Sequence, residues 1–153
     1  MRSTVVLCRL LLGAVFLLFG LNTLLWSFGT PLFPPPPSMP ERAAAFQHAL
    51  TATGFMHPLR GAVESAAGLL LVTGMMVPLA LVLLAPVLAH VVLYHAVLDP
   101  TAGGRVFTGV LVALAMFLLH AYASSFAGLL RLRPPSRWHP RANAAGRTVP
   151  PAA

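Results

Sequence analysis

The stretch that decides the fold is Leu59–Leu98, which reads LRGAVESAAGLLLVTGMMVPLALVLLAPVLAHVVLYHAVL. It carries one acid, one arginine and two histidines among residues that are otherwise mostly apolar. At a rise of about 1.5 Å per residue, each half is long enough to cross a hydrocarbon core about 30 Å thick. The stretch therefore predicts two membrane-spanning helices that fold back on each other at Val77–Pro78.

The composition of the whole chain agrees with a lipid environment. Hydrophobic residues make up 58% of the 153 residues and charged residues only 8%, whereas a soluble domain carries about 25% charged residues. The formal net charge is +7. Because five arginines follow Leu130, beside an apolar span, lipid headgroups and topology explain the charge better than nucleic acid does. The expected partner is the lipid bilayer, and no nucleic acid is expected.

Cys8 is the single cysteine of the chain. One cysteine cannot form an internal disulfide, a C-x-x-C redox pair or a four-cysteine zinc site. This excludes the membrane enzymes that exchange thiols through paired cysteines. A buried, small apolar side chain is the simplest role for Cys8.

Apolar runs along the chain predict an all-α fold with four membrane-spanning helices. The small residues of the second span, such as Gly61, Ser65 and Gly68, indicate a central helix that neighbouring backbones approach closely. Gly13 and Gly20 share one face of the first span and permit the same packing. The predicted spans are Leu10–Trp26, Arg60–Val77, Leu79–Leu98 and Val106–Phe126, and Pro86 is expected to kink the third.

A short amphipathic helix is predicted between the first and second spans. Ser38 and Glu41 have the spacing of a capping box, and Gly54 is typical of a helix stop. Phe46 and Leu50 lie four residues apart and make a modest apolar stripe. We expect this helix to lie over the outer end of a four-helix transmembrane bundle.

The arginines predict the direction of insertion. Four spans place both chain ends on one side, where Arg2, Arg9 and the five arginines of the tail outnumber the three on the other side. The positive-inside bias then places both termini in the cytoplasm of a multi-pass inner (plasma) membrane protein. We expect a membrane domain over residues 1–130 and a basic, disordered cytoplasmic tail over 131–153, which lacks the apolar content to fold.

A few polar residues inside the predicted spans need an explanation, because an ionisable group there costs about 2.5–3.5 kcal/mol. The rise per residue places Asn22, Glu64 and His95 within about 5–8 Å of the outer boundary. Arg60 shares a helix face with Glu64, and His90 lies about 12 Å deep. The candidate polar pocket therefore consists of Asn22, Arg60, Glu64, His90 and His95.

A metal site is not expected among these residues. His120 lies roughly 9 Å deeper than His90, and His90 and His95 are separated by about 140° around a regular helix. Metal and haem ligands must instead converge to about 2 Å from one centre. No serine–histidine–acid set, phosphate loop or paired-carboxylate pattern is present, so no catalytic residue is assigned and enzyme activity stays open.

Two interpretations of Glu64 and His95 remain open. In the first, they are a structural pair that fixes how the second and third spans meet, with Arg60 neutralising the acid. In the second, they form a polar pocket open to the outer face, which binds a small molecule such as a quinone or relays protons for it.

The chain resembles the DoxX family of small bacterial membrane proteins over about residues 9 to 130. The segments that carry the resemblance are Phe19–Asn22, Phe46–Phe55, Gly61–Glu64, Gly68–Leu71, Val77–Ala80, Ala85–Val87 and Tyr94–His95. Asn22, Glu64 and His95 match polar positions of the family. The chain departs from the pattern at His90, where relatives often have asparagine, and at Thr23–Trp26, which is less polar than usual.

This resemblance implies a compact four-helix membrane bundle. The family is named after a subunit of a thiosulfate:quinone oxidoreductase, and some members are linked to oxidative-stress assemblies. The expected function is that of an accessory subunit or scaffold of a quinone-linked redox or oxidative-stress assembly, in which a quinone would be the cofactor and a redox-complex subunit the partner. The alternative is a small membrane enzyme or carrier that binds a quinone-like molecule in the outer pocket. The oligomeric state is left open.

Overall fold

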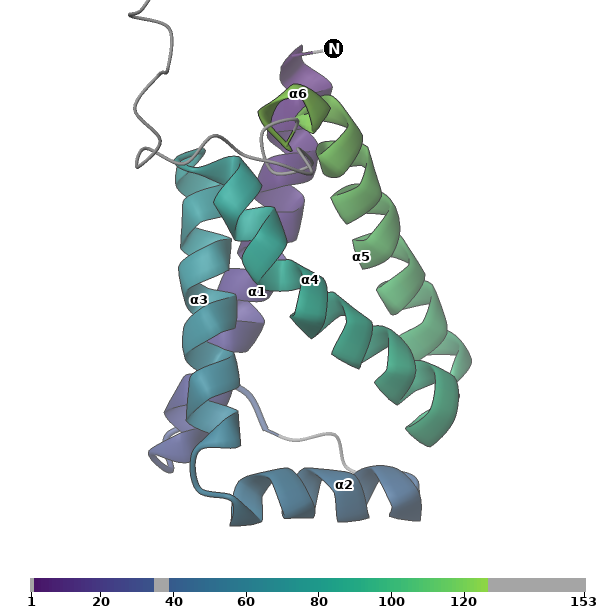
Figure 1. The fold of residues 1–153 in the computed structure, drawn as a ribbon. Helices are drawn as coiled ribbons and strands as arrows, with labels where there is room; N and C mark the ends of the chain where they lie inside the picture. The colour runs from purple at the N-terminus through teal and green to yellow at the C-terminus, as the bar shows by residue number, and fades with distance from the viewer. Residues whose placement is uncertain (1, 35–38, 127–153) are drawn as a thin grey trace, which may run out of the picture. The chain divides into compact units, whose positions relative to one another are not determined.

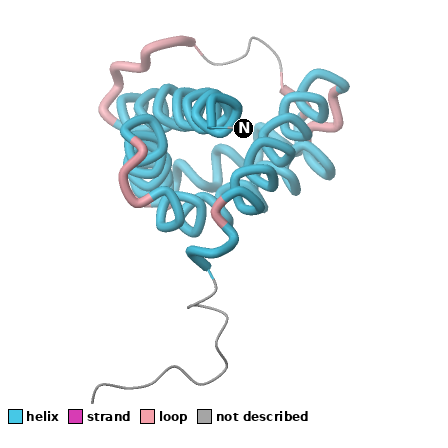
Figure 2. The backbone as a smooth tube through the Cα atoms, turned by 90° about the horizontal axis from the view of Figure 1, so that it is seen from above, coloured by secondary structure: helices cyan, strands magenta, loops and turns pink. Residues whose placement is uncertain are grey.

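The structure is a computed structural model that describes residues 2–34 and 39–126, and in that part of the chain it contains helices and no strands (Figure 2). The chain divides into two units, Met1–Ala123 and Ser124–Ala153, and everything below concerns the first. The predicted tail over 131–153 lies outside the described residues. The helices are α1 (Arg2–Ser27), α2 (Glu41–Ala52), α3 (Met56–Thr73), α4 (Val77–Leu93), the π-helix η1 (Tyr94–Leu98), α5 (Ala102–Ala121) and α6 (Ala123–Phe126).

Three of the described helices are long and apolar enough to cross a membrane, judged by length and composition. They are Arg2–Ser27, Val77–Leu98 (α4 continued by η1) and Ala102–Ala121. The prediction of an all-helical, multi-pass membrane protein is confirmed at this level. The second predicted span corresponds to α3, which carries Arg60 and Glu64 and is not among the three.

Glycines allow α1 and α3 to pack backbone against backbone, more extensively than any other pair of helices in the described chain. A Cβ built at Gly61 would lie 2.7 Å from the backbone nitrogen of Leu24, and one at Gly20 would lie 2.5 Å from that of Ser65. At the other end, a Cβ at Gly68 would lie 2.8 Å from the carbonyl oxygen of Gly13. The close approach predicted from the small residues is therefore confirmed.

The turn between α3 and α4 differs from the prediction, which placed the fold at Val77–Pro78. Gly74 ends α3 with a φ of 76°, and its N–H reaches the carbonyls of Leu70 and Leu71. Pro78 does not end a helix but lies in the first turn of α4. Both findings have the usual causes: glycine adopts the left-handed conformation readily, and proline fits where the helix needs no N–H donor.

The apolar stretch after this turn bends and then loosens into a π-helix. Pro86 lies inside α4, and α4 changes direction partway along its length (Figure 1), as expected where proline removes a backbone hydrogen bond. At the end of η1 the N–H of Asp99 donates to the carbonyl of Tyr94 at 2.9 Å. The π-helix was not predicted, and such turns often occur at functional sites.

The last long helix begins and ends earlier than predicted. It starts at Ala102 rather than Val106, because the Thr101 side chain accepts a hydrogen bond from the N–H of Gly104 and caps the helix. It ends at Ala121 rather than Phe126.

The predicted helix between the first two spans is present as α2 and lies crosswise at the end where α3 begins (Figure 1). It contacts α3 and η1. Gly54 follows it with a φ of 73°, as expected for a stop. Its N-cap is Pro40, with no side-chain hydrogen bond, instead of the predicted cap Ser38, which lies outside the described residues.

Candidate functional site

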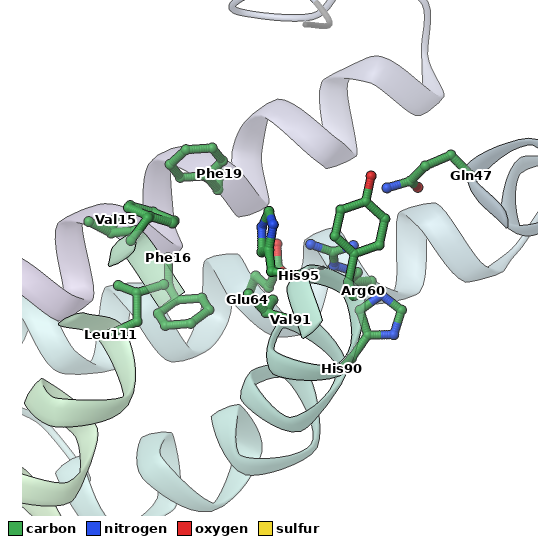
Figure 3. A pocket seen from close by; sticks show the side chains of 12 residues that line it. Val15, Phe16, Phe19, Gln47, Arg60, Glu64, His90, Val91, His95 and Leu111 are labelled. Carbon is green, nitrogen blue, oxygen red and sulfur yellow. Dashed lines mark hydrogen bonds and ion pairs between the residues drawn. The ribbon is translucent and has the colours of Figure 1, made fainter. Parts of the chain in front are cut away.

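A cavity of about 150 Å³ lies where α1, α3, α5 and the end of α4 with η1 meet α2. One part of its wall is apolar and aromatic, and the other part carries ionisable and amide side chains (Figure 3). The lining residues are Val15, Phe16, Phe19, Gln47, Arg60, Glu64, His90, Val91, Tyr94, His95, Phe107 and Leu111. Arg60, Glu64, His90 and His95, four of the five candidates predicted from the sequence, share this cavity.

Arg60 and Glu64 form the central ion pair of the cavity. The Nε–H of Arg60 donates to Oε1 of Glu64 at 2.7 Å across one turn of α3. The Glu64 side chain is 1% exposed and that of Arg60 is 29% exposed. The second carboxylate oxygen, Oε2, is buried and has no hydrogen-bond partner among the described residues. Glu64 thus has one oxygen engaged and one acceptor free beside the cavity.

His95 is held by the turn that follows it. Its Nδ1 lies 3.4 Å from Oδ2 of Asp99 and 3.4 Å from the backbone oxygen of the same residue. Glu64 and His95 line one cavity, but each is paired with a residue four positions away in its own helix or turn. Among the described residues no ion pair or hydrogen bond joins Glu64 to His95, and the structure brings the two together only as lining residues of one cavity.

Helix α2 contributes to the site through Phe46 and Gln47. The Phe46 ring lies 5.5 Å from the His90 ring and 6.3 Å from the Tyr94 ring, measured between centroids. Gln47 lines the cavity, and its Oε1 is buried without a partner among the described residues, as is Nε2 of His90. Gln47 was missed by the sequence analysis, although its position beside Phe46 on the predicted stripe was a signal for it.

Asn22 is a correction to the predicted pocket, because it does not line the cavity. Its side-chain oxygen accepts hydrogen bonds from the backbone N–H groups of Leu32 and Phe33, at 2.8 and 3.0 Å. The Phe33 ring in turn packs edge-on against Phe19, with centroids 5.6 Å apart. Through these two hydrogen bonds Asn22 holds the loop after α1 against the end of that helix.

The cavity offers hydrogen-bonding groups rather than a cluster of metal ligands among the described residues. Among the described residues no group of three or more histidine, cysteine or acidic side chains is placed to hold a metal ion. The polar part of the cavity offers Oε2 of Glu64 and Oε1 of Gln47 as acceptors, and the guanidinium of Arg60 uses only its Nε–H in the hydrogen bonds of the described residues. A ring with one hydroxyl or carbonyl group would find both donors and acceptors here.

Comparison with known proteins assigns the chain to a family. The family model described as DoxX matches residues 4–96, which is more than half of the 153 residues and covers the helices from α1 into η1. No match was found among curated proteins or solved structures. The matched range includes Arg60, Glu64, His90 and His95. The chain is a membrane protein of the DoxX family.

Proposed function

We propose that this protein binds the ring of a quinol or quinone in the cavity around Arg60 and Glu64, as an accessory subunit of a quinone-linked membrane redox assembly. The observation that carries the proposal is the buried, unpartnered Oε2 of Glu64 on the wall of a ring-sized cavity. An unsatisfied buried acceptor costs about 1–3 kcal/mol, and a ligand hydroxyl would remove that cost.

The size and chemistry of the cavity support a single ring. A protein cavity of about 150 Å³ binds a molecule the size of benzene, and the volume here is about 150 Å³. The aromatic side chains of Phe16 and Phe19 line the apolar wall. A quinol hydroxyl both donates and accepts, so it suits Oε2 of Glu64 together with the guanidinium of Arg60. A quinone carbonyl can only accept, and it would use Arg60 alone.

The same proposal includes a membrane arrangement with four crossings. The glycine contacts between α1 and α3 occur at Gly20–Gly61 and again at Gly13–Gly68, so α3 runs along α1 and shares its depth. With 18 residues, α3 is about 27 Å long, close to the hydrocarbon thickness. Pairing Arg60 with Glu64 lowers the cost of placing these charges in the membrane.

Four crossings put the two ends of the chain on one side. The excess of arginine near those ends supports a cytoplasmic location for both, in the inner membrane. Helix α2 and the polar end of the cavity then face the extracytoplasmic side. Cysteines introduced one at a time into α2 and into the α3–α4 turn, in a Cys8→Ser background, test this with a membrane-impermeant thiol reagent on intact cells: α2 should react and the turn should not.

Ligand binding is tested with purified protein in mild detergent. We expect a short-chain ubiquinol, kept reduced under anaerobic conditions, to bind the wild type. Glu64→Gln should weaken the binding by about tenfold to a hundredfold, since one lost hydrogen bond to a charged group is worth about 1.5–3 kcal/mol. The affinity for the oxidised quinone should fall less in Glu64→Gln, because the quinone does not donate a hydrogen bond to Glu64. Glu41→Gln, which changes an exposed carboxylate in α2, is the matched control.

Two results would overturn the binding role. One is the absence of ubiquinol binding to the folded wild type. The other is equal ubiquinol affinity of wild type and Glu64→Gln, which would leave the Arg60–Glu64 ion pair with a purely structural role. Mass spectrometry of lipids, quinones and subunits that co-purify with the protein tests the accessory role, and recovery without a redox subunit or quinone would contradict it.

A further inference from the structure

A second cavity lies beside the first, between α2, α3 and α4. It has a volume of about 270 Å³, and its lining residues are Leu50, Met56, His57, Leu59, Arg60, Val63, Pro86, Val87 and His90. Arg60 and His90 line both cavities. These two side chains therefore form a common boundary, with the Phe46 ring lying 5.5 Å from the ring of His90.

The chemistry of the second cavity differs from that of the first. Apart from the shared pair and His57, its lining consists of aliphatic side chains, a thioether and a proline ring. Leu59 and Met56 at its margin are 55% and 39% exposed. With α3 crossing the membrane as proposed above, this exposed apolar margin would face acyl chains, and the cavity would be a groove that opens to lipid.

The fold accounts for the position of the groove. Helices α3 and α4 are joined at Gly74 and Met76, and α4 diverges from α3 after its bend (Figure 1). Pro86, which removes a helix hydrogen bond, contributes its ring to the groove. The groove thus lies in the wedge that the bent helix leaves between α3 and α4, at the end covered by α2.

We infer that this groove holds the hydrocarbon tail of the molecule whose ring lies in the first cavity, with Arg60 and His90 at the junction between ring and tail. The inference rests on the proposed function. The occupant of the groove follows from the two shared residues. The polar cavity lies on one side of Arg60 and His90 and the apolar groove lies on the other, so a molecule with a polar ring and an apolar tail would fill both. A free acyl chain would fill the groove without explaining why it adjoins the Glu64 cavity.

The experiment compares two quinols that share one ring. One has no tail, as in ubiquinol-0, and the other has a saturated ten-carbon tail. Val63→Trp fills the groove from α3 without touching the first cavity, whose lining does not include Val63. Leu59→Trp repeats the test at a position that is 55% exposed and tolerates a larger side chain. Val110→Trp, at a 53% exposed position of α5 outside both cavities, is the control.

We expect Val63→Trp and Leu59→Trp to weaken binding of the tailed quinol by about tenfold or more, since a rigid apolar group cannot share a filled groove. Binding of the tailless quinol should stay within about twofold of the wild type, and Val110→Trp should change neither. Unchanged binding of the tailed quinol to both groove variants, or equal loss of both quinols, would overturn the groove assignment. Failure of the wild type to bind even the tailless ring would instead overturn the proposed function.

Discussion

Removing the guanidinium of Arg60 should destabilise the protein far more than removing the charge of Glu64. The Glu64 side chain is 1% exposed and depends on Arg60 for its one hydrogen bond, whereas Arg60 is 29% exposed and can turn toward solvent or headgroups. Breaking a buried pair from one side costs about 3–5 kcal/mol, because the remaining charge is buried without compensation. Arg60→Met should therefore cost about that much, and Glu64→Gln about 1 kcal/mol.

The double variant Arg60→Met/Glu64→Gln separates pairing from packing. With no buried charge left, it should be more stable than Arg60→Met alone, as expected when both members of a buried pair are replaced. Unfolding can be followed in mixed micelles with a thiol-reactive fluorophore, since Cys8 is the single cysteine and lies outside the cavity. Equal stabilities for the two single variants, or a double variant no better than Arg60→Met, would refute the reasoning.

Two further substitutions test the packing and the loop. Gly68→Ala should be less stable than Gly109→Ala by about 1–3 kcal/mol. Both variants gain helix propensity, but the new methyl at Gly68 meets the backbone of α1, whereas the one at Gly109 meets nothing within 4 Å. Equal unfolding free energies of the two variants would contradict the close packing. Asn22→Ala should increase the mobility of the loop over residues 29–34, because it removes the acceptor for two backbone N–H groups. Limited proteolysis should then cleave this loop faster than in the wild type. An unchanged cleavage rate would show that other contacts hold the loop.

Features that leave a local pattern in the sequence were predicted well. The small residues of α1 and α3 indicated the close helix pair, and Pro86 indicated the bend in α4. Arg60 and Glu64 met as expected, because a four-residue spacing on a helix is a local geometry. The helix pair and the ion pair follow from helix periodicity, and the bend follows from the missing N–H of a single proline.

Features that depend on contacts between distant segments were not predictable in the same way. Asn22 was placed in the pocket by its depth and by its match to a polar position of the family, but its oxygen accepts hydrogen bonds from N–H groups ten and eleven residues further on. Gln47 reaches the cavity only because α2 packs against α3 and η1. The α3–α4 turn was predicted a few residues too late. Pro78 was interpreted as a helix stop, but proline also fits the first turn of a helix, and Gly74 ends α3 instead.

The angle between His90 and His95 shows how the scale of a site decides what it can bind. About 140° around a regular helix keeps two imidazoles from converging on one metal ion at about 2 Å. In the structure His95 lies in the π-helix η1, and both histidines line one ring-sized cavity. His90 lies at the boundary with the groove, and His95 lies where the π-helix and Asp99 hold it. A spacing that argues against a metal centre is therefore compatible with the larger, ring-containing ligand proposed above.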